Sequence, residues 1–341
     1  MMNKRLRIGT RGSALALWQA HWVENELIRH GFLTEIVIIS TGGDQNRQGP
    51  IANLGAQGVF TKEIQNALLR NEVDLAVHSL KDLPTEPVDG LEFVASPKRG
   101  DFRDAFVSAK AKTLAKLSDG AVIGTGSVRR KAQILNLYGE RFKISDIRGN
   151  VETRLRKVDA GEFDAVVLAE AGLVRLGFER RIASFLEPPL FLPAVGQGAI
   201  GLEIRSNDTE TRRKVLYLND LATFAAVSAE RALLATLCGG CLAPVAALGL
   251  CELIDGNAAS RSLPHWSLTL TARVLSPDGT QKIETSQETT IEFWQEVKSL
   301  GEMSFDKMRQ LTQNVHDRAA ELGCKTANVL LVDGAERLLK K

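Results

Sequence analysis

The sequence predicts an α/β protein with two parallel-sheet units, followed by a separate α+β unit. Through the first two-thirds of the 341 residues, short apolar runs alternate with helical patterns, which is the rhythm of βαβ units. The rhythm restarts after Arg99-Gly100, and from about Asp220 strand-like runs precede a helix instead. At typical domain sizes this length holds two or three domains. We predict three, comprising residues 1–99 with 199–219, 100–198, and 220–341.

The first unit is predicted from buried-strand runs such as EIVII and from apolar residues at helical spacing. Thr61 is the expected N-cap of its second helix. The predicted elements, in order, are strand Leu6–Gly9, helix Ser13–Arg29, strand Glu35–Ile39, helix Thr61–Leu69, strand Val73–His78 and, much later, strand Ala199–Ile204.

The elements of the other two units are predicted in the same way. The elements of the second unit are strands Ala105–Val107, Ala121–Gly124, Lys143–Ile147 and Phe163–Ala169, with helices Ser127–Tyr138 and Val151–Ala160. In the third they are helix Thr223–Thr236, strands Val245–Leu250, Ser267–Leu275 and Gln281–Ile291, helix Phe305–Glu321 and strand Val329–Val332.

Composition excludes several classes of function. The net charge is +2 and hydrophobic residues make up 44%, so no broad basic field is available for nucleic acid or a membrane surface. No apolar run approaches the roughly 20 residues of a membrane span. The start MMNKRLRIGTRGS lacks a signal-peptide pattern. We expect a cytoplasmic monomer with reduced thiols.

Three stretches join a predicted strand to a helix in a way that favours anions. In IGTRGSALALWQA, the unpaired N–H groups of the helix start attract negative charge, and Arg11 adds a planar fork suited to carboxylate. An ordinary N-cap by Ser13 with a solvated Arg11 explains this stretch equally well. VIGTGSVRRKAQI and SDIRGNVETRLRK repeat the arrangement. A fourth stretch, AEAGLVRLG, places Arg175 soon after the predicted strand that ends at Ala169.

The arginines of these stretches favour one shared anion site. Cations in a first helical turn oppose the macrodipole by about 0.3–1 kcal/mol each, so an anionic ligand is the simpler explanation for Arg129 and Arg130. In parallel sheets, loops after the strands face the ligand crevice. Any one arginine is more simply a surface residue, but six placed alike indicate carboxylate anchors for a long ligand. The six are Arg11, Arg129, Arg130, Arg148, Arg154 and Arg175.

Asp82, in HSLKDLPTE, follows a predicted strand at the same sheet edge. It could simply cap the Pro84 turn. An ionised carboxylate among cations could also accept N–H bonds from a ligand and stabilise a developing positive charge.

The stretch LCGGCLAP raises the question of what Cys241 holds. The Cys238–Cys241 spacing is that of a redox or zinc pair. The thioredoxin context is missing, and only Cys251 lies near enough to be a third zinc ligand, so no metal is predicted. Cys238 and Cys251 read as inert buried cysteines. Gly239 and Gly240 leave room beside the Cys241 sulfur for a covalently held cofactor.

The chain resembles the porphobilinogen deaminase (hydroxymethylbilane synthase) family from Leu6 to Leu250. The motifs that carry the resemblance are GTRGSALALWQA, HSLKDLPTE, GTGSVRRKAQI, IRGNVETRL, LPAVGQGAIGLEIR and AERALLATLCGGC. The resemblance implies two domains like the lobes of type II periplasmic binding proteins, and a small α+β domain. It also implies a dipyrromethane cofactor on Cys241 in thioether linkage, built by the enzyme from its own substrate.

The activity implied by the resemblance is that of a transferase of tetrapyrrole and haem biosynthesis. Four porphobilinogens join head to tail with loss of ammonia, and water frees hydroxymethylbilane. Asp82 corresponds to the catalytic carboxylate. The implied cofactor- and substrate-binding residues are Arg11, Ser13, Gln19, Phe60, Ser79, Lys81, Thr125, Ser127, Arg129, Arg130, Arg148, Arg154, Arg175, Gly196 and Gln197.

The chain departs from the family pattern at Gln57, Gly42 and Cys238. Gln57 often corresponds to lysine, Gly42 to arginine and Cys238 to an acid. Two other functions stay open on the residues alone. A non-enzymatic intracellular anion-binding sensor would use the same cleft but gives Cys241 and Asp82 no role. A zinc- or redox-linked interaction protein would use CGGC.

Overall fold

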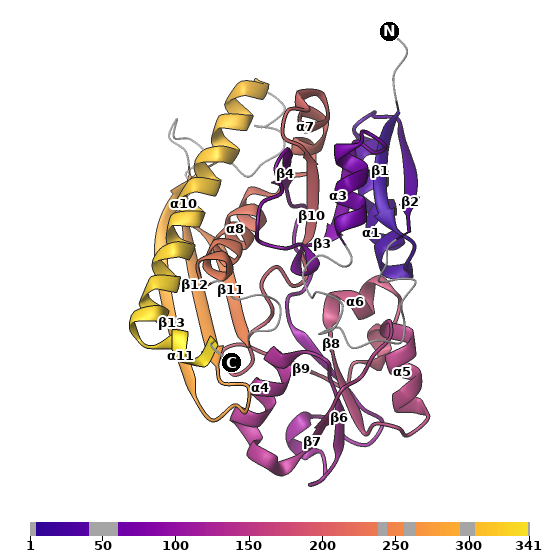
Figure 1. Cartoon of the computed structure of the whole chain (residues 1–341), viewed down its shortest axis with the longest axis vertical. Helices are drawn as coiled ribbons and strands as arrows, with labels where there is room; N and C mark the ends of the chain where they lie inside the picture. The colour runs from indigo at the N-terminus through magenta and orange to yellow at the C-terminus, as the bar shows by residue number, and fades with distance from the viewer. Residues whose placement is uncertain (1–4, 41–60, 238–243, 256–263, 294–303, 340–341) are drawn as a thin grey trace.

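The computed structural model describes residues 5–40, 61–237, 244–255, 264–293 and 304–339. Three sheets form its framework, two of five strands and one of three, and helices pack on them (Figure 1). This confirms the predicted α/β class with a C-terminal α+β unit. The figure shows the two five-stranded sheets one above the other, with the third sheet beside them.

The first sheet has the order β2-β1-β3-β10-β4. Strands β1, β2 and β3 run parallel, and β10 is antiparallel to both of its neighbours. Its strands are β1 (Leu6–Arg11), β2 (Thr34–Ile39), β3 (Leu75–Ser79), β4 (Leu91–Ala95) and β10 (Ile200–Arg205).

The second sheet repeats this arrangement in the order β7-β6-β8-β5-β9, with β5 as the antiparallel strand. Its strands are β5 (Asp104–Val107), β6 (Val122–Gly124), β7 (Lys143–Ser145), β8 (Ala165–Ala169) and β9 (Ser184–Leu186). The chain leaves the first sheet after β4 and returns to it at β10. Two connections therefore join the sheets: a first crossing, residues 96–103, and a second crossing, residues 187–199.

The helices largely follow the predicted positions. Ser13, Ser127 and Asn150 cap helices that begin just after strands, each accepting a hydrogen bond from a main-chain N–H. Thr61 precedes its helix, but its hydroxyl makes no cap bond because its backbone is already helical. The helices are α1 (Ala14–Arg29), α3 (Lys62–Leu69), α4 (Val128–Tyr138), α5 (Val151–Asp159), α6 (Glu170–Arg175), α7 (Thr209–Val215), α8 (Leu221–Thr236), α10 (Phe305–Val332) and α11 (Ala335–Leu339).

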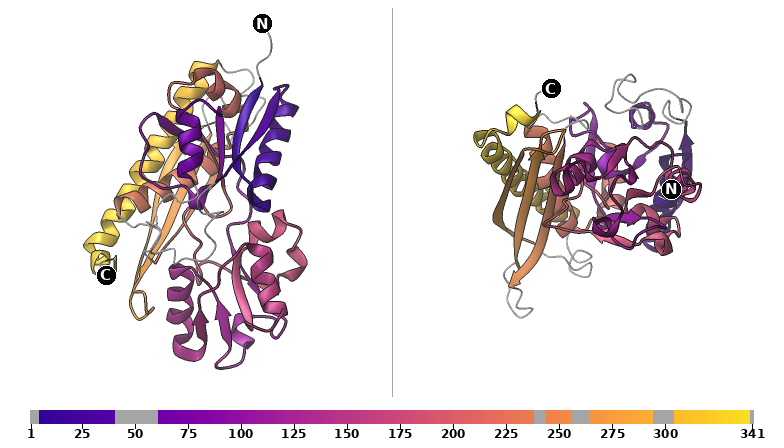
Figure 2. Two further views of the ribbon diagram at one scale, coloured as in Figure 1. Left: turned by 45° about the vertical axis from the view of Figure 1, so that its right-hand side comes forward. Right: turned by 90° about the horizontal axis from the view of Figure 1, so that it is seen from below.

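The third sheet is antiparallel, and α8 and α10 cover it (Figure 2). Its strands are β11 (Val245–Asp255), β12 (His265–Leu275) and β13 (Lys282–Glu292). Helix α8 lies so close to its neighbours that two glycines are required. A Cβ on Gly249 of β11 would lie 2.7 Å from the Ala226 oxygen, and one on Gly323 of α10 would lie 2.4 Å from the Ala229 oxygen.

The predicted strand Val329–Val332 is wrong, because these residues form the last turn of the 28-residue helix α10. The helix buries Leu322, Thr326 and Leu330 at a spacing of four residues, whereas Val332 is exposed. The helical period of the buried face therefore prevails over the strand preference of valine.

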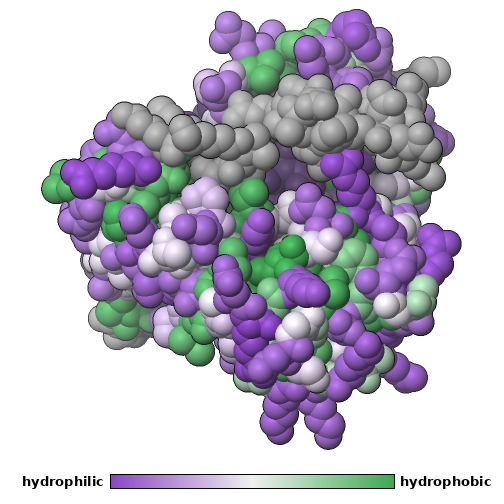
Figure 3. Space-filling model, turned by 60° about the horizontal axis from the view of Figure 1, so that its bottom comes forward, coloured by the Kyte–Doolittle hydropathy of each residue, from purple (hydrophilic) through white to green (hydrophobic). Residues whose placement is uncertain are grey.

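No described helix is both long and apolar enough to cross a bilayer. Over the described part of the face shown in Figure 3, hydrophilic and hydrophobic residues are interspersed.

Glu230 of α8 connects both crossings to the third sheet. Its side chain is fully buried. It accepts hydrogen bonds from Arg99 Nη1 at 2.6 Å in the first crossing, from the Gly196 N–H at 2.6 Å in the second crossing, and from the Gly249 N–H at 2.8 Å in β11. Each partner would be left unsatisfied in the interior without this carboxylate.

We expect Glu230→Gln to lower the free energy of unfolding by about 3–5 kcal/mol, because the substitution leaves the Arg99 charge buried and unpaired. Chemical denaturation would measure the change. Glu210→Gln is the control, since Glu210 is exposed and pairs with Lys214 on the helix surface; it should shift stability by less than about 0.5 kcal/mol. Equal stability of the two variants would contradict the role of Glu230.

Candidate functional site

Charged groups from the first and second sheets meet in one region. Lys81 follows β3 of the first sheet, and loss of water around it lowers the pKa of its ammonium group to about 8. Arg130 and Arg129 of α4, beside the second sheet, lower this pKa further, whereas Asp82 and Asp104 oppose the shift. The predicted residues of both units therefore lie within electrostatic reach of one another.

Arg154 of α5 belongs to the same region. Burial lowers the pKa of its guanidinium to about 10, Arg130 lowers it further, and Asp82 opposes the shift. Its Nε donates to the Gly149 oxygen at 2.9 Å. Its two terminal nitrogens make no hydrogen bond with the described residues, so they can receive a carboxylate.

The side chain of Asp82 is exposed at the end of a short 3₁₀ turn, Leu80–Asp82. Within the described part of the chain, its carboxylate makes neither a hydrogen bond nor an ion pair. The main chain around it is fixed, because the Leu80 N–H donates to the Ala199 oxygen and the Leu83 N–H to the Leu80 oxygen. The site thus presents an accessible carboxylate on a held turn.

A small hollow beside Asp82 contains an unused hydrogen-bond donor. Gln19 is 1% exposed, and its Oε1 accepts from Ser79 Oγ at 3.0 Å. Its Nε2 has no partner among the described residues. A buried unsatisfied donor costs about 1–3 kcal/mol, so this amide suits a ligand with an acceptor oxygen. Arg11, Ser13, Ser79 and Asp82 also line the hollow.

Arg129 and Arg130 both form ion pairs with Asp104, an aspartate of the protein itself. Arg129 Nη1 lies 2.8 Å from Asp104 Oδ2, and Arg130 Nη2 lies 2.7 Å from Asp104 Oδ1. Burial alone would raise the pKa of Asp104, but the two guanidiniums outweigh it and lower the pKa to about 2. The ligand anion expected from the sequence is, at these two side chains, an internal carboxylate. Two cations and one anion leave a net charge of +1.

Arg175 contacts elements of both units. Its Nη2 donates to the Gly198 oxygen in the second crossing at 2.6 Å, and its guanidinium carbon lies 5.5 Å from the centre of the Trp18 ring on α1. Burial lowers the pKa of Arg175 to about 10, and Glu170 opposes the shift.

The other predicted binding residues divide into three groups. Thr125, Gly196 and Gln197 are buried, and Gln197 Nε2 donates to Asp104 Oδ1 at 3.1 Å. Ser127 is half-buried at the α4 N-cap, and Arg148 is exposed in the loop before α5. Phe60, Cys241, Gln57, Gly42 and Cys238 lie outside the described residues.

The position of Cys241 in the chain is bracketed by described residues. Helix α8 ends at Thr236 with Leu237 as its C-cap, and β11 begins at Val245. Of the cysteines that the structure describes, Cys251 is an unreactive thiol: burial, Asp220 and Glu252 raise its pKa to about 12.

Sequence reasoning missed Asp104, Glu230 and Arg231. The signal available was charge inside otherwise apolar runs, in RDAFV and SAERALL. Charged residues in such runs are buried only when paired.

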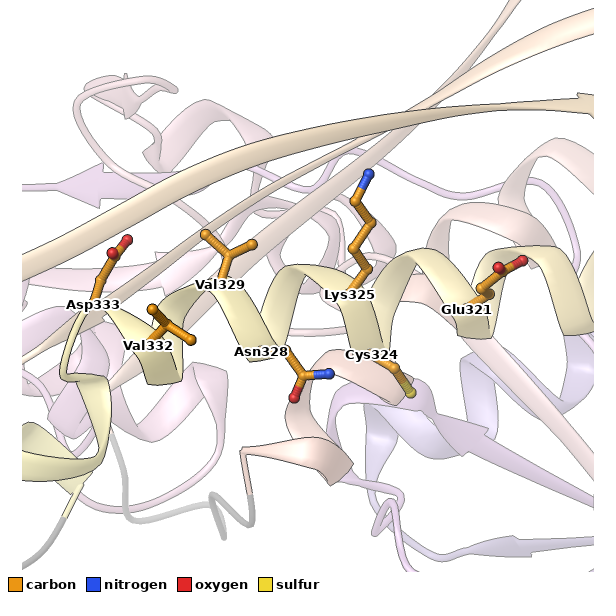
Figure 4. A pocket seen from close by; sticks show the side chains of 7 residues that line it. All are labelled: Glu321, Cys324, Lys325, Asn328, Val329, Val332 and Asp333. Atoms are coloured by element: carbon orange, nitrogen blue, oxygen red, sulfur yellow. The ribbon is translucent and has the colours of Figure 1, made fainter.

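A larger hollow lies along α10, outside this region (Figure 4). Its lining residues lie on that one helix from Glu321 to Val332, together with the C-cap residue Asp333. Cys324, also in the lining, accepts a hydrogen bond from Thr236 Oγ1 at 3.3 Å. Lys325 is the one cation among these residues, so the hollow lacks the cation cluster predicted for a polyanion.

Two family models match the chain. One is described as porphobilinogen deaminase, dipyrromethane cofactor binding domain, over residues 6–213, and the other as the porphobilinogen deaminase C-terminal domain, over residues 224–310. The porphobilinogen deaminase of Trichlorobacter lovleyi is 47% identical over 285 residues, covering 83% of this chain and 87% of the relative. That of Geobacter metallireducens is 43% identical over 324 residues, covering 94% and 96%.

Solved structures with a similar trace are more distant. A putative methionine-binding lipoprotein from Bacillus subtilis is 14% identical with a TM-score of 0.41, covering 63% of this chain and 90% of that one. A periplasmic substrate-binding protein of an ABC transporter from Coxiella burnetii is 15% identical with a TM-score of 0.40, covering 62% and 90%.

Since the pKa of Lys81 is lowered to about 8, its ammonium group should be charged below that pH and neutral above it. We expect the affinity of the site for carboxylates to fall as the pH rises through about 8. NMR titration of ¹³C-methylated lysines would check this, with the Lys81 signal assigned by its absence in Lys81→Arg. A midpoint near the ordinary value of about 10.4 would contradict the lowered pKa.

Proposed function

The chain belongs to the porphobilinogen deaminase family, and from this premise we propose how its own residues serve the reaction. It is a transferase that condenses four porphobilinogen molecules head to tail with loss of ammonia, after which hydrolysis frees hydroxymethylbilane for tetrapyrrole biosynthesis. One observation carries the assignment of residues. Lys81 and Asp82 of the first unit share an electrostatic environment with Arg130 and Arg154 of the second.

The residues around Asp82 fit the dipyrromethane cofactor of the family. Its acidic side arms suit the guanidinium of Arg154, the ammonium of Lys81 and the unpaired Gln19 amide. Its pyrrole N–H groups suit the exposed carboxylate of Asp82. We propose Cys241 as the attachment residue. When bound, the cofactor supplies the free pyrrole position to which the first substrate is added.

We propose that Asp82 is the catalytic carboxylate. Loss of ammonia from porphobilinogen leaves positive charge on the methylene-pyrrole, and an anion already in place stabilises that charge without reorganisation. The carboxylate is accessible and its turn is fixed, so it can accept pyrrole N–H bonds while remaining in position.

The cations divide into two groups. Arg11, Lys81, Arg148 and Arg154, with the hydroxyls of Ser13, Ser79 and Ser127, are proposed to bind acetate and propionate groups directly. Each porphobilinogen brings two carboxylates, so a growing chain needs many such partners. Arg129 and Arg130 are buried and share the internal anion Asp104, and Arg175 binds the Gly198 oxygen of the second crossing. Together with the buried Thr125, Gly196 and Gln197, they are proposed to shape the cleft and to add positive potential.

The three sheets support the proposed division into domains of residues 1–99 with 199–219, 100–198, and 220–341, since each group contains one sheet. Nothing in the comparisons favours the anion-sensor function.

We further propose that the protein works as a cytoplasmic monomer. Light scattering at working concentration tests the monomer, and a dimer mass would contradict it.

Asp82→Asn should lower turnover by two orders of magnitude or more, because it removes the charge that stabilises the developing cation. Steady-state porphobilinogen consumption measures this, with circular dichroism to verify the fold. Asp89→Asn is the matched control, since Asp89 is another exposed aspartate in the same connection between β3 and β4. Near-normal turnover of the Asp82 variant would refute the proposed role.

The purified protein should be heavier than its sequence by two pyrrole units and should colour pink with acidic Ehrlich reagent. Peptide mapping should place the addition on Cys241. Cys241→Ser should lose the added mass and Cys238→Ser should keep it. An adduct on Cys238 would overturn the proposed attachment.

A further inference from the structure

Arg231 of α8 binds the main chain directly after Asp82. Its Nη1 donates to the Leu83 oxygen at 2.9 Å, and its Nη2 donates to the Pro84 oxygen at 2.7 Å. Its guanidinium carbon lies 5.5 Å from the centre of the Phe93 ring. Because the guanidinium is planar and rigid, two bonds to consecutive carbonyls fix both the position and the orientation of this segment.

Arg231 also lies within electrostatic reach of Glu203, which binds the strand that precedes the turn. Burial lowers the pKa of Arg231 to about 10, and Glu203 opposes the shift. Glu203 Oε2 lies 2.9 Å from Nε2 of His78 on β3, and Oε1 accepts from Gln65 Nε2 at 2.9 Å. Arg231 thus binds the turn at its exit, whereas Glu203 binds His78 in the strand that leads into the turn.

The neighbouring residue, Glu230, binds Gly196, which packs against the turn. It accepts a hydrogen bond from the Gly196 N–H at 2.6 Å. Gly196 lies so close to the turn that a Cβ there would be 3.2 Å from the Lys81 nitrogen and 3.1 Å from Leu80 Cγ. Two consecutive residues of α8 therefore restrain the main chain around Asp82, Arg231 directly and Glu230 through Gly196. The carboxylate of Asp82 remains exposed.

The same helix leads to the cofactor cysteine, since α8 ends at Thr236 and Cys241 follows five residues later. We propose that Arg231 is a positioning residue, which sets the catalytic carboxylate of Asp82 relative to helix α8, the helix that precedes Cys241 in the sequence. This inference rests on the roles proposed above for Asp82 and Cys241.

Arg231→Gln tests the proposal in the full-length, cofactor-loaded protein. A displacement of about 1 Å in a reacting group can cost about 100-fold in rate. We expect kcat to fall about 10- to 100-fold while KM changes less than about threefold, with the added cofactor mass retained. Arg231→Lys, which can keep one of the two bonds, should recover part of the loss. If the Gln variant fails to fold, the Lys variant alone should show an intermediate fall in kcat.

Arg205 provides a matched control. It also donates to two main-chain carbonyls, those of Leu68 at 3.0 Å and Val73 at 2.6 Å. It ends β10, five residues beyond Ile200, which pairs with Ser79. Arg205→Gln should keep kcat within about threefold, even where it lowers the melting temperature. An equal loss of kcat in both variants would indicate general destabilisation and overturn the proposal.

A double variant separates positioning from an independent role. If Arg231 acts through Asp82, then adding Arg231→Gln to Asp82→Asn should lower the single-turnover rate by less than about threefold further. Multiplicative losses, or wild-type kcat in Arg231→Gln, would contradict this inference alone. Near-normal activity of Asp82→Asn would instead contradict the proposed function on which it rests.

Discussion

The buried carboxylate of Glu230 is the interaction on which the arrangement of the three sheets depends. Arg99 in the first crossing, Gly196 in the second and Gly249 in the third sheet all donate to it. The crossings also bind each other, since the Gly100 N–H donates to the Gly198 oxygen at 3.2 Å. A buried charge tolerates few alternative arrangements, because any that breaks a bond leaves an unpaired group in the interior.

The sequence predicts the local elements well, because hydrophobic periodicity is a local property. The βα rhythm and the caps at Ser13 and Ser127 follow from it. The strand expected at Val329–Val332 is wrong for the same reason, since only the packing of α10 on α8 and the third sheet reveals its helical face. Strand β4 and helix α6 are not among the predicted elements.

The candidate site could be predicted in its residue types but not in its pairings. The arginine-rich loops indicate a polyanion site, yet nothing local tells that Arg129 and Arg130 share Asp104, or that Arg175 holds the Gly198 oxygen. These partners lie 23 to 26 residues away along the chain. Only the antiparallel return of β5 beside β8 brings Asp104 to the start of α4.

Asp104 and Asp82 show how one site can concentrate positive charge while the carboxylate of Asp82 stays unpaired among the described residues. Asp104 is buried, its pKa is lowered to about 2, and its two oxygens occupy both arginines of α4. Because those guanidiniums are already paired, they supply a net positive field but no direct partner for Asp82. The Asp82 carboxylate stays exposed, and Arg231 binds the main chain directly after it. The anion that must meet a developing cation is thus fixed through its backbone, while its oxygens remain available to the ligand.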